Sequence, residues 1–354
     1  MEDSYRDTSR PQPLRDSRLQ DNGRQDNGRQ DAFEAAKTDR QPLPDAPLQL
    51  PEALSFSVFD EAAGESIPPA KTLHRTVPNF GDAILFTLLA FFFIFLLEAL
   101  FGGIALAFHL LPHQTTAQLA REPKLIVPAM ALAYLFTLLA SALIFPLMWR
   151  RGFFNGIRWH FEAIDRFNWL LPAIGIAVGL TMQFLQNYLP MPKTVPMDDF
   201  FRTRVDIWIV TAFGTLIAPA FEEITFRGML LPAIANVWDW LSRLGNSSTR
   251  LEPAAQTTSL FGAAIPAFAA STPGLIASSI FTSVFFAFLH SDQLGHSVSP
   301  LILLFSVSLV LTAVRVRTGS VAASALVHAS YNFSVFLTMF IATGGYRHLE
   351  KLKP

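Results

Sequence analysis

Residues 83–111 read AILFTLLAFFFIFLLEALFGGIALAFHLL, and Glu98 is the one acidic residue in this long apolar run. A helix rises about 1.5 Å per residue, so about 20 residues cross the roughly 30 Å of hydrocarbon in a bilayer. The run is longer than this requirement. It therefore decides the fold class, because it predicts a helix that spans a membrane.

Further apolar runs of helical length follow along the chain. Prolines interrupt two of them: the stretch 260–290 contains one long or two short runs, and 207–241 predicts two helical pieces around Pro219. Four others are well delimited, at residues 125–148, 169–189, 301–316 and 321–342. The sequence thus predicts an all-α, polytopic membrane helix bundle of about seven to eight transmembrane helices.

The composition supports a membrane protein with a polar N-terminal tail. Hydrophobic residues make up 51% of the chain and charged residues 16%, against roughly 25% charged in soluble domains. Residues 1–76 hold 24 of the charged residues and contain the pentapeptide DNGRQ twice. Such a segment cannot bury enough apolar surface to offset its ordering entropy. We therefore predict a disordered polar tail over residues 1–76 and a transmembrane helical domain over residues 77–354.

The residue types exclude several kinds of function. The chain has no cysteine, so disulfides, thiolate metal sites and a cysteine nucleophile are ruled out. The charges outside the tail give no basic face of the kind that binds nucleic acid, so we expect no nucleic-acid partner. The expected surroundings are the membrane lipid bilayer.

Basic residues in one loop indicate an orientation. Four arginines crowd residues 150–166, after the second predicted span, and basic loops stay in the cytoplasm. This arrangement predicts a cytoplasmic N-terminus. Basic residues around Arg315 and Arg347 leave the C-terminal half open, because a single span separates them and both would prefer the cytoplasm.

Polar and ionisable side chains within the predicted spans concentrate in three segments, IAPAFEEITFRGMLLP, SSIFTSVFFAFLHSD and AASALVHASYNFSVF. Inserting an ionisable residue near the middle of a membrane span costs about 2.5–3.5 kcal/mol, so each such residue is expected to have a polar partner or a functional role. Residues four apart lie on the same face of a helix. That spacing occurs in each segment: Glu223 and Arg227, which follow Glu222, then Phe286 and His290, then His328 and Asn332.

The two adjacent glutamates are expected to have different roles. Glu223 and Arg227 can form an ion pair in the low-dielectric interior. Glu222 points about 100° away around the helix axis, so it is free to face a cavity as a general base. His290 and His328 are its natural companions.

Each group also has a purely structural interpretation. A Glu–Arg pair can hold helices together, His328 with Asn332 can form interhelical hydrogen bonds, and Phe286 can belong to the core. Glu98 has no partner that the sequence identifies. The joint occurrence of the three segments favours a functional site.

The motifs EExxxR, FxxxH and HxxxN, in this order on apolar helices, resemble the signature of the CPBP family. These are intramembrane proteases that include the CAAX prenyl endopeptidases and the bacterial Abi-type proteins. The resemblance covers about residues 150–342; the tail has no counterpart in it, and the polar stretch 242–259 is an insertion between the first two motifs. It implies an endopeptidase acting on membrane-associated or prenylated, CAAX-type peptide substrates.

The resemblance also implies a role for each residue. Glu222 and His290 would activate a water, His328 and Asn332 would stabilise the oxyanion, Glu223 and Arg227 would orient the site, and Phe286 would position the substrate.

A zinc ion is an open alternative. Glu222, His290 and His328 match the ligand types of a catalytic zinc site, which would leave Glu223 as the base, although the chain contains no HExxH. We favour a water activated directly by Glu222 and His290, without a required cofactor.

Two other function classes stay open at this point. In a proton-coupled transporter, buried Glu and His residues relay protons, but transporters commonly contain internal repeats and none is visible here. A non-catalytic immunity or scaffold membrane protein of the same fold would have no need of Glu222 beside Glu223.

Overall fold

The computed structural model describes residues 78–110, 122–245 and 270–352. The predicted tail, residues 1–76, and most of the stretch 242–259 lie outside these ranges. The described residues form helices and turns without a strand, and seven helical segments among them are long and apolar enough to cross a membrane. The predicted all-α, polytopic membrane bundle is therefore confirmed.

The helices follow the predicted runs. Short connecting elements are α5 (Phe153–Gly156), α6 (Glu162–Phe167) and the 3-10 helices η1 (Gln186–Tyr188), η2 (Pro196–Phe201) and η5 (Leu349–Leu352). The spans consist of α2 (Phe80–Ala107), α4 (Pro123–Trp149), α7 (Leu170–Leu185), α8 (Arg204–Ala212), the π-helix η3 (Phe213–Ile217), α9 (Ala218–Glu223), the π-helix η4 (Ile224–Leu230), α10 (Leu231–Gly245), α11 (Thr272–Leu289), α12 (Val298–Thr318) and α13 (Val321–Ala342).

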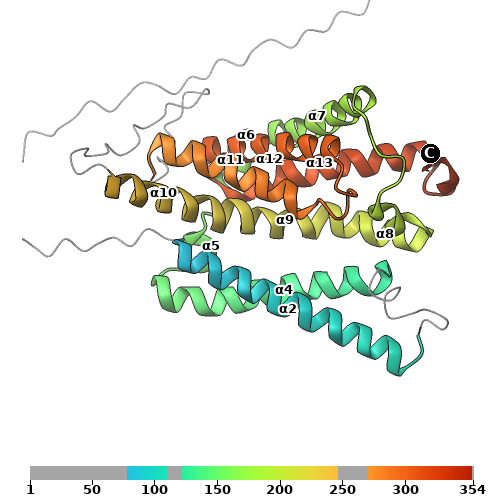
Figure 1. Ribbon diagram of the computed structural model, residues 1–354, viewed down its shortest axis with the longest axis horizontal. Coiled ribbons are helices and arrows are strands. Elements are labelled where there is room, and N and C mark those ends of the chain that lie inside the picture. The colour runs from blue at the N-terminus through green and yellow to red at the C-terminus, as the bar shows by residue number, and fades with distance from the viewer. Residues whose placement is uncertain (1–77, 111–121, 246–269, 353–354) are drawn as a thin grey trace, which may run out of the picture. The chain divides into compact units, whose positions relative to one another are not determined.

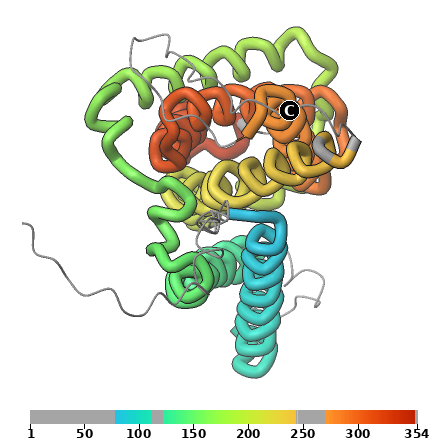
Figure 2. Tube along the Cα trace, turned by 90° about the vertical axis from the view of Figure 1, so that its left-hand side faces the viewer, coloured from blue at the N-terminus to red at the C-terminus, as the bar shows by residue number. Residues whose placement is uncertain are grey.

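One long helix, built from α8, η3, α9, η4 and α10, lies between two groups of helices. Helices α2 and α4 pack against each other as a pair on one side of it (Figure 1). Helices α7, α11, α12 and α13 lie on the other side, and Figure 2 shows the same separation from a second direction. Because α13 packs against both α7 and α9, the middle of the long helix is held beside α13.

The prediction of two helical pieces around Pro219 was wrong, since the chain is continuously helical from Arg204 to Gly245. Proline removes a backbone donor and clashes with the preceding turn of an α-helix. Here the π-helix η3 directly precedes α9, and its wider turn accommodates the proline ring without a break. The second π-helix, η4, begins directly after Glu223.

Helices α7 and α13 approach each other closely at two glycines. A Cβ at Gly175 would overlap the backbone of Val327, and a Cβ at Gly179 would overlap the hydroxyl of Ser334. Small residues four apart on one helix face let two backbones come together inside a membrane. This contact fixes the position of α13, which carries two of the predicted site residues.

A two-residue turn joins α12 to α13. Gly319 ends α12 in the left-handed conformation, at φ 68°, and the hydroxyl of Ser320 accepts from the backbone N–H of Ala323 to begin α13. The tight turn keeps the end of α12 next to the start of α13, so side chains from both helices reach the same buried region.

Candidate active site

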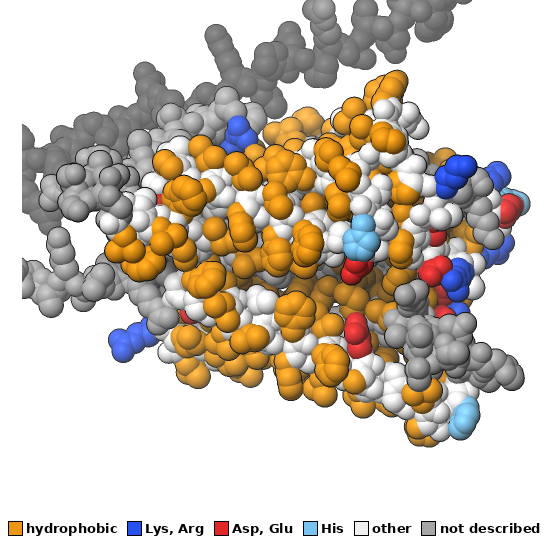
Figure 3. Space-filling view, in the orientation of Figure 1, with side chains coloured by type: hydrophobic (Ala, Val, Ile, Leu, Met, Phe, Trp, Pro, Cys, Tyr) orange, Lys and Arg blue, Asp and Glu red, His pale blue; other side chains and the backbone are white. Residues whose placement is uncertain are grey.

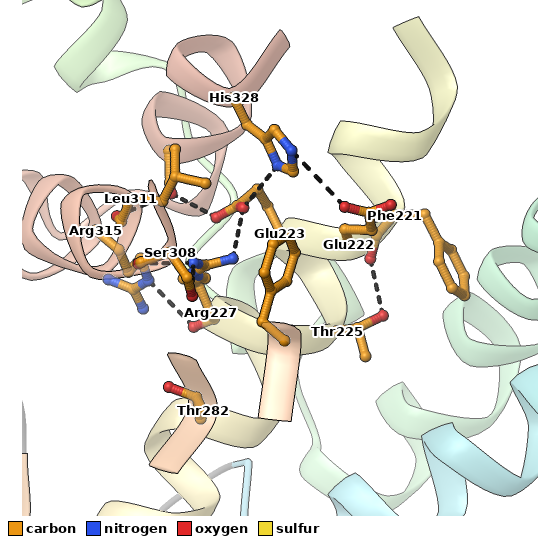
Figure 4. Close-up of polar contacts among 12 residues, drawn as sticks. Phe221, Glu222, Glu223, Thr225, Arg227, Thr282, Ser308, Leu311, Arg315 and His328 are labelled. Atoms are coloured by element: carbon orange, nitrogen blue, oxygen red, sulfur yellow. Dashed lines mark hydrogen bonds and ion pairs between the residues drawn. The ribbon is translucent and has the colours of Figure 1, made fainter. Parts of the chain in front are cut away.

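A buried ion pair forms the base of the candidate site (Figure 4). Arg227 Nη1 donates to Glu223 Oε1 over 2.7 Å, at the four-residue spacing noted in the sequence, and both side chains are fully buried. Arg227 Nη2 donates to the carbonyl and to the hydroxyl of Ser308 on α12, over 2.8 and 2.7 Å. The pair therefore compensates its own charge and fastens the long helix to α12.

His328 lies next to both glutamates. Its Nδ1 is 3.0 Å from Glu223 Oε1, and its Nε2 is 3.7 Å from Glu222 Oε2 (Figure 4). Because a carboxylate can only accept, Nδ1 carries the proton and donates to Glu223, which leaves Nε2 on the side of Glu222. A separation of 3.7 Å is longer than a direct hydrogen bond, so a water can bridge the two atoms.

Phe286 and His290 lie at the end of α11. Phe286 is buried, and its ring centre is 4.7 Å from that of His290 and 5.9 Å from that of His328. His290 Nδ1 donates to the carbonyl of Phe286 over 2.8 Å, so its Nε2 is left as an acceptor. Within the described ranges His290 makes no ion pair with Glu222; the imidazole paired with that carboxylate is His328.

Asn332 lies one turn after His328 on α13. Its Nδ2 donates to the carbonyl of Gly214 over 2.6 Å. That carbonyl belongs to η3, where the π-helical turn changes the ordinary hydrogen-bond pattern of the backbone. An amide carries two hydrogens on Nδ2, so one of them is still available to a ligand.

Glu222 is the accessible member of the group. Its side chain is 22% exposed, against 4% for His328 and 0% for Glu223. Figure 3 shows a hollow in an otherwise apolar face, with acidic side chains and a histidine at its edge. A molecule that enters the site would therefore meet Glu222, while Glu223 stays enclosed.

The ligand types of a zinc site are present, but their arrangement differs from one. Across residues 78–110, 122–245 and 270–352, no group of three or more His, Asp or Glu side chains is arranged to hold a metal ion. Glu222 and His328 are neighbours, but His290 does not form a three-ligand group with them. The described residues as arranged do not fit a metal ion.

Three further side chains complete the buried network. The hydroxyl of Ser324 donates to Glu223 Oε2. The guanidinium of Arg315 donates to a backbone carbonyl of η4 over 3.3 Å. Ser308 accepts hydrogen bonds from the guanidinium of Arg227. Ser324 precedes His328 by four residues, and this spacing could have identified it. Ser308 and Arg315 come from α12, and no local spacing connects them with the other motifs.

The fold and the site define a multi-pass membrane protein with a carboxylate–imidazole centre between its helices. Residues 204–334 match the model of a protein family described as type II CAAX prenyl endopeptidase, Rce1-like. These residues contain all three motifs, so the match confirms the resemblance to the CAAX proteases, and this part of the chain is similar to that family. No curated protein and no solved structure matches the chain.

Proposed function

We propose that the protein is an intramembrane endopeptidase that hydrolyses prenylated, CAAX-type peptides with a water activated by Glu222. The main observation in support of this proposal is the position of the His328 imidazole. The buried Glu223 holds it by a hydrogen bond, and it faces the accessible carboxylate of Glu222. The family match supports peptide hydrolysis as the reaction and a prenylated peptide as the substrate class.

In the first step Glu222 accepts a proton from the water, and the water oxygen attacks the carbonyl carbon of the scissile peptide bond. His290 has an acceptor at Nε2, which suits it to hold the same water. When the C–N bond breaks, protonated Glu222 returns the proton to the leaving amine. The atoms balance with one water consumed and no other reactant.

The tetrahedral intermediate carries a negative oxygen that needs donors. When His328 carries a second proton, at Nε2, that N–H and the second amide hydrogen of Asn332 would be the donors for this oxygen. Glu222 Oε2 and His328 Nε2 are close enough to contact the two oxygens of the intermediate at once. Glu223 would compensate the charge on the imidazolium, as the carboxylate does in other hydrolases that orient a histidine.

The test is cleavage of a farnesylated CAAX peptide by the purified full chain in lipid nanodiscs. Glu222→Gln should lower kcat/KM by about 10²–10⁴-fold, the usual contribution of a general base, and His290→Ala should also reduce it. Glu350→Gln makes the same chemical change at an exposed position near the C-terminus and should have no effect. Equal rates for the wild type and the Glu222 and His290 variants would refute the assignment.

A further inference from the structure

Glu98 is an acidic residue of the first span that the mechanism above does not use. It lies in the second half of α2, outside the matched residues 204–334, and its side chain is accessible. Within the described part of the chain it makes no hydrogen bond and no ion pair. A carboxylate within a membrane span is costly unless it finds a partner, so its presence needs an explanation.

The packing of α2 shows on which face Glu98 lies. Ile94 packs against the cluster that contains Tyr134 of α4 and Phe221 of α9, and Glu98 lies about one turn further along the same face. Leu97, directly before Glu98, packs against α4. Glu98 therefore lies on the side of α2 that is directed toward α4 and the long helix.

Tyr134 connects this face with the candidate active site. Its ring stacks on Phe221 with 3.7 Å between the ring centres and 4° between the planes, and Phe221 directly precedes Glu222. Tyr134 is only 8% exposed, yet its hydroxyl makes no hydrogen bond to any described residue. The phenol lies within electrostatic reach of both Glu98 and Glu222. A firmly held hydroxyl with unused hydrogen-bonding capacity thus lies within electrostatic reach of two carboxylates.

Glu98 has no cationic counter-ion among the described residues, whereas Glu222 has His328 at 3.7 Å. Glu223 has Arg227 as its counter-ion, but no described Lys or Arg forms an ion pair with Glu98 or Glu222. Carboxylates in low-dielectric surroundings attract a cation strongly. An ammonium or guanidinium group also brings several donors, which a carboxylate and a phenol oxygen can accept.

We propose that Glu98 and Tyr134 form a subsite that binds a lysine or arginine side chain of the peptide substrate. This inference rests on the proposed endopeptidase function and names a feature of its substrate. The cation would donate to Glu98 and to the Tyr134 oxygen, and the Tyr134 hydroxyl would still have its own hydrogen to donate. Glu98 would then be a positioning residue that sets which peptide bond lies beside Glu222.

The test uses pairs of farnesylated peptides that differ at one position, where one peptide has lysine and the other has uncharged norleucine. The position is moved in turn along both sides of the scissile bond. Binding to the full chain in nanodiscs is measured by competition with a fluorescent peptide, and cleavage is measured as separate kcat and KM. At one position we expect the wild type to prefer lysine about tenfold, equivalent to about 1.4 kcal/mol, through KM rather than kcat.

The variants separate a charge effect from a structural effect. Glu98→Gln should abolish the preference while leaving the norleucine peptide unchanged, Glu98→Asp should retain most of the preference, and Glu350→Gln should retain all of it. The subsite would be overturned if the wild type showed no preference for lysine at any position. It would also be overturned if the preference survived Glu98→Gln, or if Glu98→Gln weakened the binding of both peptides equally. If the wild type cleaves neither peptide, the proposed function fails, while the binding measurements still decide the subsite.

Discussion

Replacement of Arg227 by methionine tests the ion pair at the base of the site. The change keeps a long unbranched side chain but removes the charge and every donor. Glu223 would keep its hydrogen bonds to Ser324 and His328, yet its charge would stay enclosed without a counter-ion. The carbonyl and hydroxyl of Ser308 would lose their shared donor.

The expected magnitude follows from these contacts. Removal of one partner of a buried ion pair costs about 3–5 kcal/mol, because the remaining charge is uncompensated. The acceptors of Ser308 add about 1 kcal/mol. We expect Arg227→Met to lower the free energy of unfolding by about 4–6 kcal/mol. Adding Glu223→Gln removes the unpaired charge, so the double variant should recover about 2 kcal/mol relative to the sum of the single changes.

The assay is reversible unfolding of the purified protein in mixed micelles by a titration with sodium dodecyl sulfate, followed by tryptophan fluorescence. Arg202→Met is the matched control: Arg202 pairs with Asp199 over 2.6 Å, but both side chains are exposed, so the loss should stay below about 1 kcal/mol. A loss of this small size for Arg227→Met, or strict additivity in the double variant, would show that the buried pair does not stabilise the site as argued.

Three further predictions concern the helices around the site. Gly179→Leu should force α7 away from α13 and lower the free energy of unfolding by about 1–3 kcal/mol or more, measured in the same titration. Ser324→Ala should cost about 1.5–3 kcal/mol, because a donor to the charged Glu223 is lost, and should also reduce peptide cleavage while Glu350→Gln does not. Burial raises the pKa of the Tyr346 phenol above its usual value, so the stability it contributes is complete at pH below about 10 and is lost as the pH rises further. Tyr346→Phe should therefore flatten the alkaline decline in melting temperature, at a cost of about 1 kcal/mol at pH 7 for its lost hydrogen bonds, which include the one to Thr211.

The sequence predicts helix positions well where an apolar run and its caps agree. The run 321–342 coincides with α13, because Gly319 ends the preceding helix and Ser320 caps the next one. The run 83–111 is displaced from α2, which begins at Phe80 after a capping box and ends at Ala107. Apolar character continues past the helix end there, so hydropathy alone could not locate it.

Some contacts of the site could be predicted from local spacing in the sequence, and others depend on how distant helices pack. Four-residue spacing was enough to predict the contact between Glu223 and Arg227, since both lie on one helix. The contact with Ser308 spans 81 residues of sequence and depends on how α12 packs. Pro219 misled the prediction because the π-helix that accommodates it leaves no signal in the apolar pattern.

The adjacent glutamates separate two requirements that a single carboxylate could not meet. A group that fixes Nδ1 of His328 has to be enclosed and permanently paired, whereas a general base has to reach water and exchange a proton. Neighbouring positions on a helix diverge by about 100°, which puts Glu223 inside the bundle and Glu222 at the opening. Glu98 lies outside the matched residues and would have a third role. The matched helices would carry the catalytic groups, and α2 with α4 would carry the subsite that selects the substrate. Loss of lysine preference in Glu98→Gln with kcat unchanged would separate the two functions, whereas a parallel loss of both would show that the subsite and the catalytic groups are one unit.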